Sequence, residues 1–431
     1  MWQRWTRACL YSLLAPIAVH AGPSDATVTA ELVEALAARI AQLERKVVEL
    51  ETQLRRSAPP GNASSAAAAA EANSKLEPAP AHSHVQVAQE LANPPMDTQS
   101  PPSVPKLQIS GFSDVNFVSS DQRGSRSGFT EGQFALHTTT ALSPRVNVFG
   151  ELTLTARSDA GTGVPPAAGF NAEVERILIR FDQSDYFKVS FGRFHTPINW
   201  WNTSFHHGQW LQTTASRPEM VQFGGRFIPV HFVGGLVEGA LPAGGLRLNY
   251  TAGVGNGRGS VISRGGDAGD ENNNRAWLVN VFIKPDRPFG LLAGASVYRD
   301  KITQGARSFQ EWIHSAHLVW QKENPEFIAE VANVRHTETG RPGGFNSQAF
   351  YMQLGYRLRR QQQWKPYYRF EYIHIPASDP VFRGVPSLAG SVAGIRYDLT
   401  HFAAFKVEYR NLRRPGLPRI NLGFAQTSFT F

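Results

Sequence analysis

The sequence contains a single cysteine, Cys9, among 431 residues. One cysteine excludes an intramolecular disulfide framework, a zinc site built from several cysteines and, given its place near the N-terminus, a Cys-His nucleophile. The mean hydropathy of −0.29 excludes a bundle of transmembrane helices, each of which needs about 20 mainly apolar residues. Four methionines stand against 38 glycines and 27 phenylalanines. This composition favours strands and turns.

Catalytic signatures are also missing. The sequence has no Gly-x-Ser-x-Gly elbow and no His-Glu-x-x-His pair, so we expect no catalytic residue, no metal, no cofactor and no enzymatic activity. The net charge is +8, but the arginines are dispersed over strand-like segments rather than gathered in a binding module. We therefore expect no nucleic-acid partner.

The first 21 residues have the form of a secretory signal peptide. Arg4 and Arg7 precede a short apolar stretch over 8–19, and Val19-His20-Ala21 ends with small residues at the two positions that a signal peptidase reads. The apolar stretch is too short for a mature membrane span. The alternative is an N-terminal membrane anchor. Cys9 lies before the cleavage site, so it is not a lipoprotein cysteine.

Residues 27–56 are expected to form a coiled-coil oligomerisation segment. Apolar residues recur there at spacings of three and four: Val33, Leu36, Ile40, Leu43, Val47, Leu50 and Leu54. Such a seam is typical of a coiled coil. β-branched residues at a with leucine at d favour a dimer, whereas the stretch Arg39 to Glu44 resembles a short signature of trimeric coiled coils. We expect a trimer, with a dimer or an intramolecular amphipathic helix as alternatives.

Residues 57–105 are rich in Ala, Pro and Ser and lack aromatic residues and apolar periodicity. Such a segment cannot bury enough apolar surface to offset the entropy of ordering, so we expect a disordered linker. His82 and His84 lie within it, but two histidines without a third ligand do not indicate a metal site.

Residues 106–431 alternate strand-like runs with turns. We count sixteen candidate strands, several with strict alternation of apolar and polar residues, as in Leu246–Thr251 and Phe405–Arg410. Short connections such as Ser143-Pro144 alternate with longer ones, for example 195–225 and 300–307. This arrangement is typical of an up-and-down barrel in the outer membrane. The sequence therefore predicts an all-β fold: a 16-stranded antiparallel transmembrane β-barrel preceded by a coiled-coil helix. A soluble β-sandwich or propeller is the alternative.

The segment from Gly192 to Thr213, which includes His195-Thr196-Pro197-Ile198-Asn199-Trp200-Trp201-Asn202 and His206-His207-Gly208-Gln209-Trp210, resembles loop sequence of the phosphate-selective porin O and P family. The resemblance extends in architecture over 106–431, and the N-terminal extension is similar to trimeric porins with a coiled coil. It implies a sixteen-stranded trimer that passes small anions or other small solutes. It also implies that the loop at about 195–225 folds inward as a constriction; an aromatic extracellular loop is the alternative. Its candidate residues are His195, Trp200, Trp201, His206, His207 and Trp210. Because no Lys or Arg lies between His195 and Arg217, a lysine cluster for phosphate is not visible.

Strand parity assigns the charges that face the lumen, with the apolar face placed outward. The acidic candidates are Glu151, Asp182, Glu371, Asp398 and Glu408. The basic candidates are Arg176, Arg180, Lys188, Arg247, Arg357, Arg359, Arg369, Arg396, Lys406 and Arg410. An excess of basic side chains predicts a mild anion preference. In the alternative, the arginines pair with neighbouring carboxylates and only stiffen the wall.

These observations together predict a passive diffusion porin for small anionic or polar solutes in the outer membrane of a Gram-negative bacterium. We expect outer-membrane lipid around it, a homotrimer as its assembly and the coiled coil in the periplasm. His206 and His207 are expected to line the pore or support it structurally, because no carboxylate is near them in sequence. A second hypothesis is a structural envelope tether, with the barrel as anchor and the coiled coil as spacer.

Overall fold

The computed structural model describes Arg45 and residues 105–158, 168–222, 226–263 and 266–431. The expected signal peptide (1–21), coiled coil (27–56) and linker (57–105) fall outside the described residues, apart from Arg45 and Pro105. Within the described ranges, no helix is long and apolar enough to cross a membrane.

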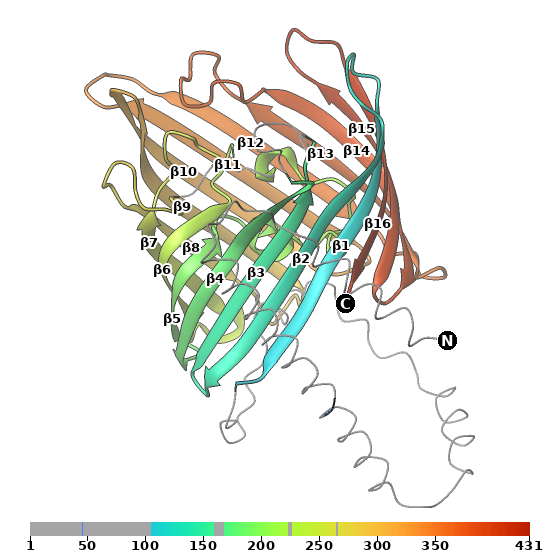
Figure 1. Ribbon diagram of the computed structural model, residues 1–431, viewed down its shortest axis with the longest axis horizontal. Coiled ribbons are helices and arrows are strands. Elements are labelled where there is room, and N and C mark those ends of the chain that lie inside the picture. The colour runs from blue at the N-terminus through green and yellow to red at the C-terminus, as the bar shows by residue number, and fades with distance from the viewer. Residues whose placement is uncertain (1–44, 46–104, 159–167, 223–225, 264–265) are drawn as a thin grey trace, which may run out of the picture. The chain divides into compact units, whose positions relative to one another are not determined.

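The described chain forms a closed antiparallel barrel in which sequence neighbours are also spatial neighbours (Figure 1). The fold class predicted for 106–431 is therefore confirmed. The strands are β1 (Leu107–Ser120), β2 (Gly128–Ser143), β3 (Val146–Ala156), β4 (Phe170–Ser184), β5 (Phe187–His195), β6 (His231–Leu241), β7 (Leu248–Asn256), β8 (Ala276–Ile283), β9 (Leu291–Gln304), β10 (Arg307–Trp320), β11 (Glu326–Glu338), β12 (Phe345–Gly355), β13 (Trp364–His374), β14 (Leu388–Thr400), β15 (Ala403–Arg413) and β16 (Ile420–Thr430).

The barrel closes by pairing its first strand with its last. β1 and β16 are in register from Phe112 opposite Thr430 to Ser120 opposite Leu422. The C-terminal Phe431 completes the seam, because its backbone exchanges two hydrogen bonds with Gly111 and its ring stacks on Phe134 with 5.6 Å between the centroids. Closure leaves no unpaired strand edge, which a membrane-spanning sheet requires.

The two faces of the strands differ in chemistry, as β15 illustrates. Val407 and Tyr409 point outward and are 46% and 52% exposed, while Lys406, Glu408 and Arg410 point inward and are buried. The period of two sends alternate side chains to opposite faces of the sheet. An apolar outer face with charges inside is the pattern of a barrel surrounded by lipid.

One connection is shorter than the sequence predicts. The expected long loop at 300–307 is a two-residue turn, because β9 continues to Gln304 and pairs there with Arg307 of β10. Gly305 in this turn has a φ of 60°, a left-handed conformation that glycine adopts without a steric penalty. A glycine at the first position of a two-residue loop is a signal for such a tight hairpin turn, so Gly305 could have predicted it.

Candidate functional site

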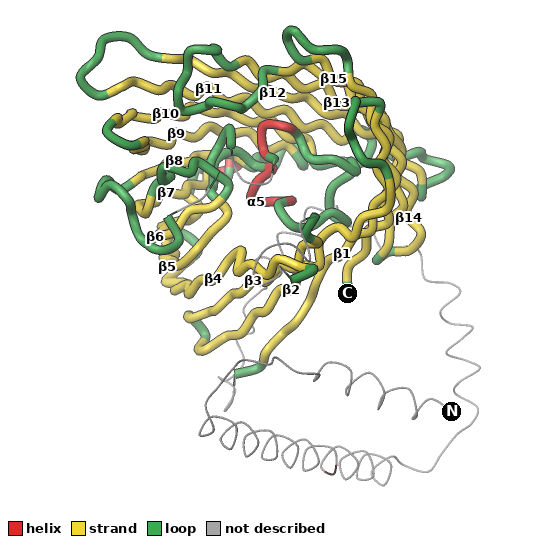
Figure 2. The backbone as a smooth tube through the Cα atoms, turned by 45° about the horizontal axis from the view of Figure 1, so that its top comes forward, coloured by secondary structure: helices red, strands yellow, loops and turns green. Residues whose placement is uncertain are grey.

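The described parts of the connection between β5 and β6, residues 196–222 and 226–230, fold into the interior of the barrel (Figure 2). We call this connection the lumen loop; it contains α5 (Trp201–Phe205) and the 3-10 turn η2 (Glu219–Val221). Of the residues expected in a constriction, Trp200, Trp201, His206, His207 and Trp210 are buried in this loop, and His195 is the last residue of β5. The loop is therefore enclosed by the barrel wall.

Carboxylates of the wall hold the loop by its backbone amides. One oxygen of Glu330, on β11, accepts hydrogen bonds from the backbone N–H groups of Trp200 at 2.8 Å and Trp201 at 2.7 Å. Three further wall carboxylates accept bonds from the loop: Glu326 from the Thr213 hydroxyl, Glu371 from the Glu219 amide and Glu408 from the Ala215 amide. Hydrogen bonds to a charged group stabilise more strongly than neutral ones.

Arg369 and Arg396 hold the carbonyl groups of the same loop. Arg369, on β13, donates to the backbone oxygens of Ser216 and Arg217, both at 3.0 Å. Arg396, on β14, donates to those of Trp210 at 2.6 Å and Gln212 at 2.9 Å. Both arginines are almost completely buried.

Two basic residues of β15 complete this contact. Lys406 donates to the carbonyl oxygens of Gln209 at 2.5 Å and Thr214 at 3.1 Å, and Arg410 donates to the Glu219 carboxylate at 2.6 Å. Strands β11 to β15 therefore form one side of the barrel whose inward charges bind the loop. We call this side the clamped arc. Its basic residues contact loop atoms and neighbouring carboxylates instead of an open lumen.

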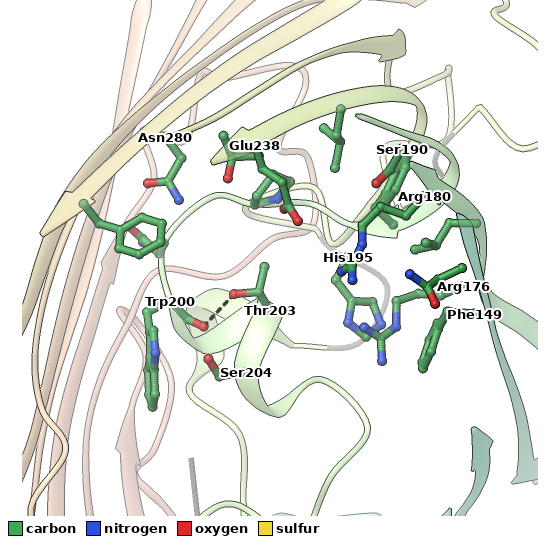
Figure 3. A pocket seen from close by; sticks show the side chains of 18 of the residues that line it. Phe149, Arg176, Arg180, Ser190, His195, Trp200, Thr203, Ser204, Glu238 and Asn280 are labelled. Atoms are coloured by element: carbon green, nitrogen blue, oxygen red, sulfur yellow. Dashed lines mark hydrogen bonds between the residues drawn. The ribbon is translucent and has the colours of Figure 1, made fainter. Parts of the chain in front are cut away.

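The opposite side of the barrel leaves a cavity beside the loop. This cavity lies between Trp200 at the loop edge and the inner faces of β2 to β10, which we call the open arc (Figure 3). Arg176, Arg180 and Lys284 supply positive charge to the cavity lining, and Glu238 supplies a carboxylate. Arg176 and Arg180 also pair with Glu151 and Asp182, respectively.

Lys284 is a cavity residue that the sequence analysis missed. It follows directly after β8, its ammonium lies 5.3 Å from the Phe282 ring centroid, and burial lowers its pKa. Among the described residues it has no ion-pair partner. Phe282 and Lys284 line the same cavity, so apolar residues occupy both faces of β8 and hide its alternation.

Four other predicted pore-lining residues lie away from the cavity lining. Lys188 lies on β5, in register between Asp182 and Glu238. Arg247 was expected inside the alternating run Leu246–Thr251, but β7 begins at Leu248 and Arg247 occupies a turn with φ 44° and pairs with Asp286. Arg357 and Arg359 were expected to face the lumen from a strand, but they lie beyond the end of β12 at Gly355.

The remaining acidic candidates serve as partners of basic side chains. Asp398, on β14, pairs with Arg357 at 2.6 Å and with Arg396 at 2.7 Å. Glu371 pairs with Arg410 at 2.8 Å. The charges of the wall are therefore largely matched, as expected when arginines stiffen the wall by pairing with carboxylates.

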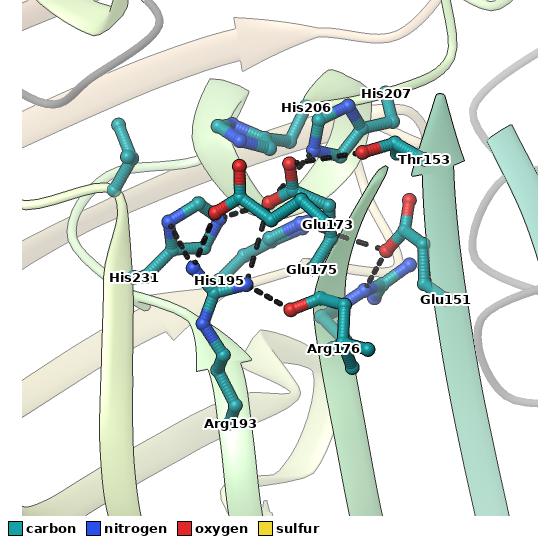
Figure 4. Close-up of polar contacts among 12 residues, drawn as sticks. Glu151, Thr153, Glu173, Glu175, Arg176, Arg193, His195, His206, His207 and His231 are labelled. Atoms are coloured by element: carbon teal, nitrogen blue, oxygen red, sulfur yellow. Dashed lines mark hydrogen bonds and ion pairs between the residues drawn. The ribbon is translucent and has the colours of Figure 1, made fainter. Parts of the chain in front are cut away.

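Four histidines and a glutamate meet where the lumen loop joins β4, β5 and β6 (Figure 4). Each of Glu175, His195, His206, His207 and His231 offers one atom, and these atoms all lie within 4.8 Å of one another. A register shift between β3 and β4 makes this possible: Glu151 is opposite Arg176 but Leu152 is opposite Val174. The extra residue is Glu175, and such bulges redirect side chains.

Burial disfavours the charged form of the two loop histidines of this group. Burial lowers the pKa of His206 and of His207, because desolvation disfavours the imidazolium, although the hydrogen bond to Glu175 acts in the opposite direction on His207. The sequence does not reveal this carboxylate, because Glu175 is more than thirty residues before the two histidines in the chain.

No family model and no curated protein matches this sequence. Solved structures with a similar fold are outer-membrane porins. The anion-selective porin of Comamonas acidovorans is 12% identical at a TM-score of 0.56, covering 76% of this chain and 100% of its own. OmpF of Salmonella typhi, in complex with daunomycin, is 11% identical at 0.51, over 76% and 98%. OmpT of Vibrio cholerae, in a trimer form, is 12% identical at 0.51, over 76% and 100%. The chain thus has the porin fold.

Proposed function

We propose that this protein is a passive diffusion porin of the outer membrane for small anionic or polar solutes. The observation that carries the proposal is the cavity between the lumen loop and the open arc, whose lining includes the charged groups of Arg176, Arg180, Lys284 and Glu238. A loop bound along one arc leaves the opposite arc as the path, and the aromatic edge at Trp200 narrows it. Passage by diffusion requires no catalytic step and no cofactor.

A mild anion preference follows from the charges along that path. Three basic side chains and one carboxylate line the cavity, and fixed positive charge raises the local concentration of anions. Because paired carboxylates partly neutralise the charges of Arg176 and Arg180, the excess of positive charge along the path is small. The resemblance to the phosphate-selective porin O and P family supports anionic solutes. Basic side chains of the clamped arc donate to backbone carbonyl groups of the loop, so they add little positive charge to the path. This supports only modest selectivity.

We also propose a homotrimer secreted through the signal peptide 1–21, with the segments 27–56 and 57–105 as periplasmic coiled coil and linker. The similar fold of the Vibrio cholerae OmpT trimer supports this assembly. Crosslinking of the mature chain with and without residues 27–56 tests the role of the coiled coil. Loss of trimers in the truncated chain is expected; unchanged trimers would mean that the barrel alone assembles.

Current measurements in planar bilayers test the function. We expect ohmic single-channel steps and, in a KCl gradient, a reversal potential on the anion side of zero. A preference for cations would contradict the basic path. A barrel that inserts into the bilayer without conducting would instead favour the structural envelope tether.

A further inference from the structure

The histidine cluster beside the cavity has the composition of a metal site. We propose that Glu175, His195, His206, His207 and His231 bind one divalent transition-metal ion of the zinc class, between the lumen loop and strands β4 to β6 (Figure 4). Imidazole nitrogens with a carboxylate are ligands that suit zinc, copper and nickel. Four of these five side chains are enough for a tetrahedral site.

Hydrogen bonds on the far side of two rings aim the ligand nitrogens. Asn202 donates its amide to the carbonyl oxygens of Thr196 and Val230, at 3.1 and 3.0 Å, so its own oxygen faces Nδ1 of His206 at 3.0 Å. His206 therefore carries its proton on Nδ1 and presents the Nε2 lone pair to the cluster. Metal-binding histidines in proteins commonly have such a partner on the second nitrogen.

His207 has the same arrangement with a partner from the wall. Its Nδ1 lies 3.1 Å from the side-chain oxygen of Gln133 on β2, and its Nε2 lies 3.2 Å from Oε2 of Glu175. Nε2 of His207 and this carboxylate oxygen therefore face each other, and a cation between them would be bound by both.

His195 provides a second and independent observation. Its side chain is only 4% exposed, and neither ring nitrogen has a hydrogen-bond partner among the described residues. The ring centroid lies 4.3 Å from that of His206, and the nearest carboxylate oxygen on Nε2, from Glu151, is 3.6 Å away. A buried imidazole without hydrogen bonds is costly unless another group binds it.

His231 and Arg193 define what must change when the ion binds. Nε2 of His231 lies 2.6 Å from Oε2 of Glu175, and its Nδ1 accepts a hydrogen bond from Arg193 at 3.2 Å. Ligation at Nε2 requires the ring proton to move to Nδ1, and Arg193 must then release Nδ1 because that nitrogen no longer accepts a hydrogen bond. Arg193 keeps its charge paired, because it also binds Glu173 at 3.0 Å and Asp267 at 2.8 Å.

The size of the cluster requires a small contraction on binding. Zinc–nitrogen distances of about 2.0–2.1 Å place tetrahedral ligand atoms roughly 3.3 Å apart, against a present span of up to 4.8 Å. Side-chain rotation of His206 and His207, which lie on the loop, can supply this movement. His195 lines the adjoining cavity and gives the ion a route from the lumen.

A bound ion would attach the loop to strands β4 to β6, which lie outside the clamped arc. His206 and His207 belong to the loop, whereas Glu175, His195 and His231 belong to strands. The consequence is a loop fixed at both edges in the presence of metal. This inference concerns binding and is independent of whether the cavity conducts.

The test is Zn²⁺ titration of the full mature chain in detergent, after EDTA treatment and dialysis, by calorimetry with atomic-absorption stoichiometry. We expect one Zn²⁺ bound per chain. The double variant His195→Gln, His207→Gln should bind at least about tenfold more weakly. His317→Gln, a buried lumen histidine outside the cluster, is the matched control and should bind as the wild type does.

A second variant separates ligand loss from misfolding. Glu175→Gln keeps the shape of the side chain and removes its charge, so we expect weakened Zn²⁺ binding in a barrel that still shows the heat-dependent gel mobility of the wild type. Absence of stoichiometric binding to the wild type would overturn the proposal. So would wild-type affinity in both the double variant and Glu175→Gln, because the ion would then lie elsewhere, for example at His82 and His84.

Discussion

The clamped arc and the open arc carry similar side chains and use them differently. On the clamped arc, Arg369, Arg396 and Lys406 donate to backbone oxygens of the lumen loop. On the open arc, Arg176 and Arg180 pair with carboxylates of the wall at the edge of a cavity. The type of residue and its strand face therefore do not determine whether a basic side chain binds the loop or faces solute. It depends on which part of the barrel wall the loop contacts.

Trp200 lies between the two arcs. Trp200 and Trp201 lie at the end of the loop that Glu330 of β11 holds by two amides. Trp200 faces the cavity of the open arc. The hydrogen bonds from the clamped arc thus fix the position of Trp200 and with it the width of the path along the open arc. Removing these hydrogen bonds should change conduction.

The largest effect is expected from removing two arginines of the clamp together. Arg369→Met with Arg396→Met deletes four hydrogen bonds to loop carbonyls, each with a charged donor and each worth about 1.5–3 kcal/mol. The loop should detach from the clamped arc, and single-channel recordings should show a changed conductance with increased current noise.

The control for this pair is Arg307→Met. Arg307 is an exposed arginine at the β9–β10 turn that pairs with Glu338 at 2.8 Å and makes none of the hydrogen bonds to the loop described above. It should conduct as the wild type does. Wild-type conductance and noise in the double variant would mean that the clamp does not hold the loop.

A smaller effect is expected from Glu330→Leu, which leaves two buried backbone N–H groups without their acceptor at about 1–3 kcal/mol each. Local loosening around Trp200 and Trp201 should shift tryptophan fluorescence to longer wavelength as water enters. Glu330→Gln retains an acceptor oxygen and should stay close to the wild type. Equal spectra for the leucine and glutamine variants would mean that Glu330 does not hold the loop.

The smallest effect is expected on the open arc. Lys284→Glu reverses a cavity charge that has no ion-pair partner among the described residues, so it should move the reversal potential toward cations. The shift should be on the order of 10 mV, against about 59 mV for ideal selectivity in a tenfold gradient. It should shrink at 1 M salt, where the screening length is about 3 Å.

Arg341→Glu makes the same charge change on an exposed outer loop, where Arg341 pairs loosely with Glu338 at 3.5 Å. It should leave the reversal potential almost unchanged. If both variants shifted the potential equally, selectivity would arise from the net charge of the protein rather than from the cavity lining.

Local alternation of residues predicted much of the barrel. In Phe405-Lys406-Val407-Glu408-Tyr409-Arg410 the period of two places apolar residues on one face of the strand and charged residues on the other. The structure has the same two faces on β15. The prediction weakened where the period failed. Apolar residues on both faces of β8 hid Lys284, and a tight turn at Gly305 replaced an expected long loop.

The sequence by itself determined that the strands have two chemically different faces and that successive strands pair antiparallel, because alternation and turn residues act between chain neighbours. Only the tertiary structure decided the contacts of the lumen loop. Trp200 and Glu330 are 130 positions apart, and Glu175 reaches the histidines through a bulge whose extra residue leaves no mark in the pattern. Such contacts arise from barrel closure, which brings distant strands around one enclosed loop and which no local period encodes.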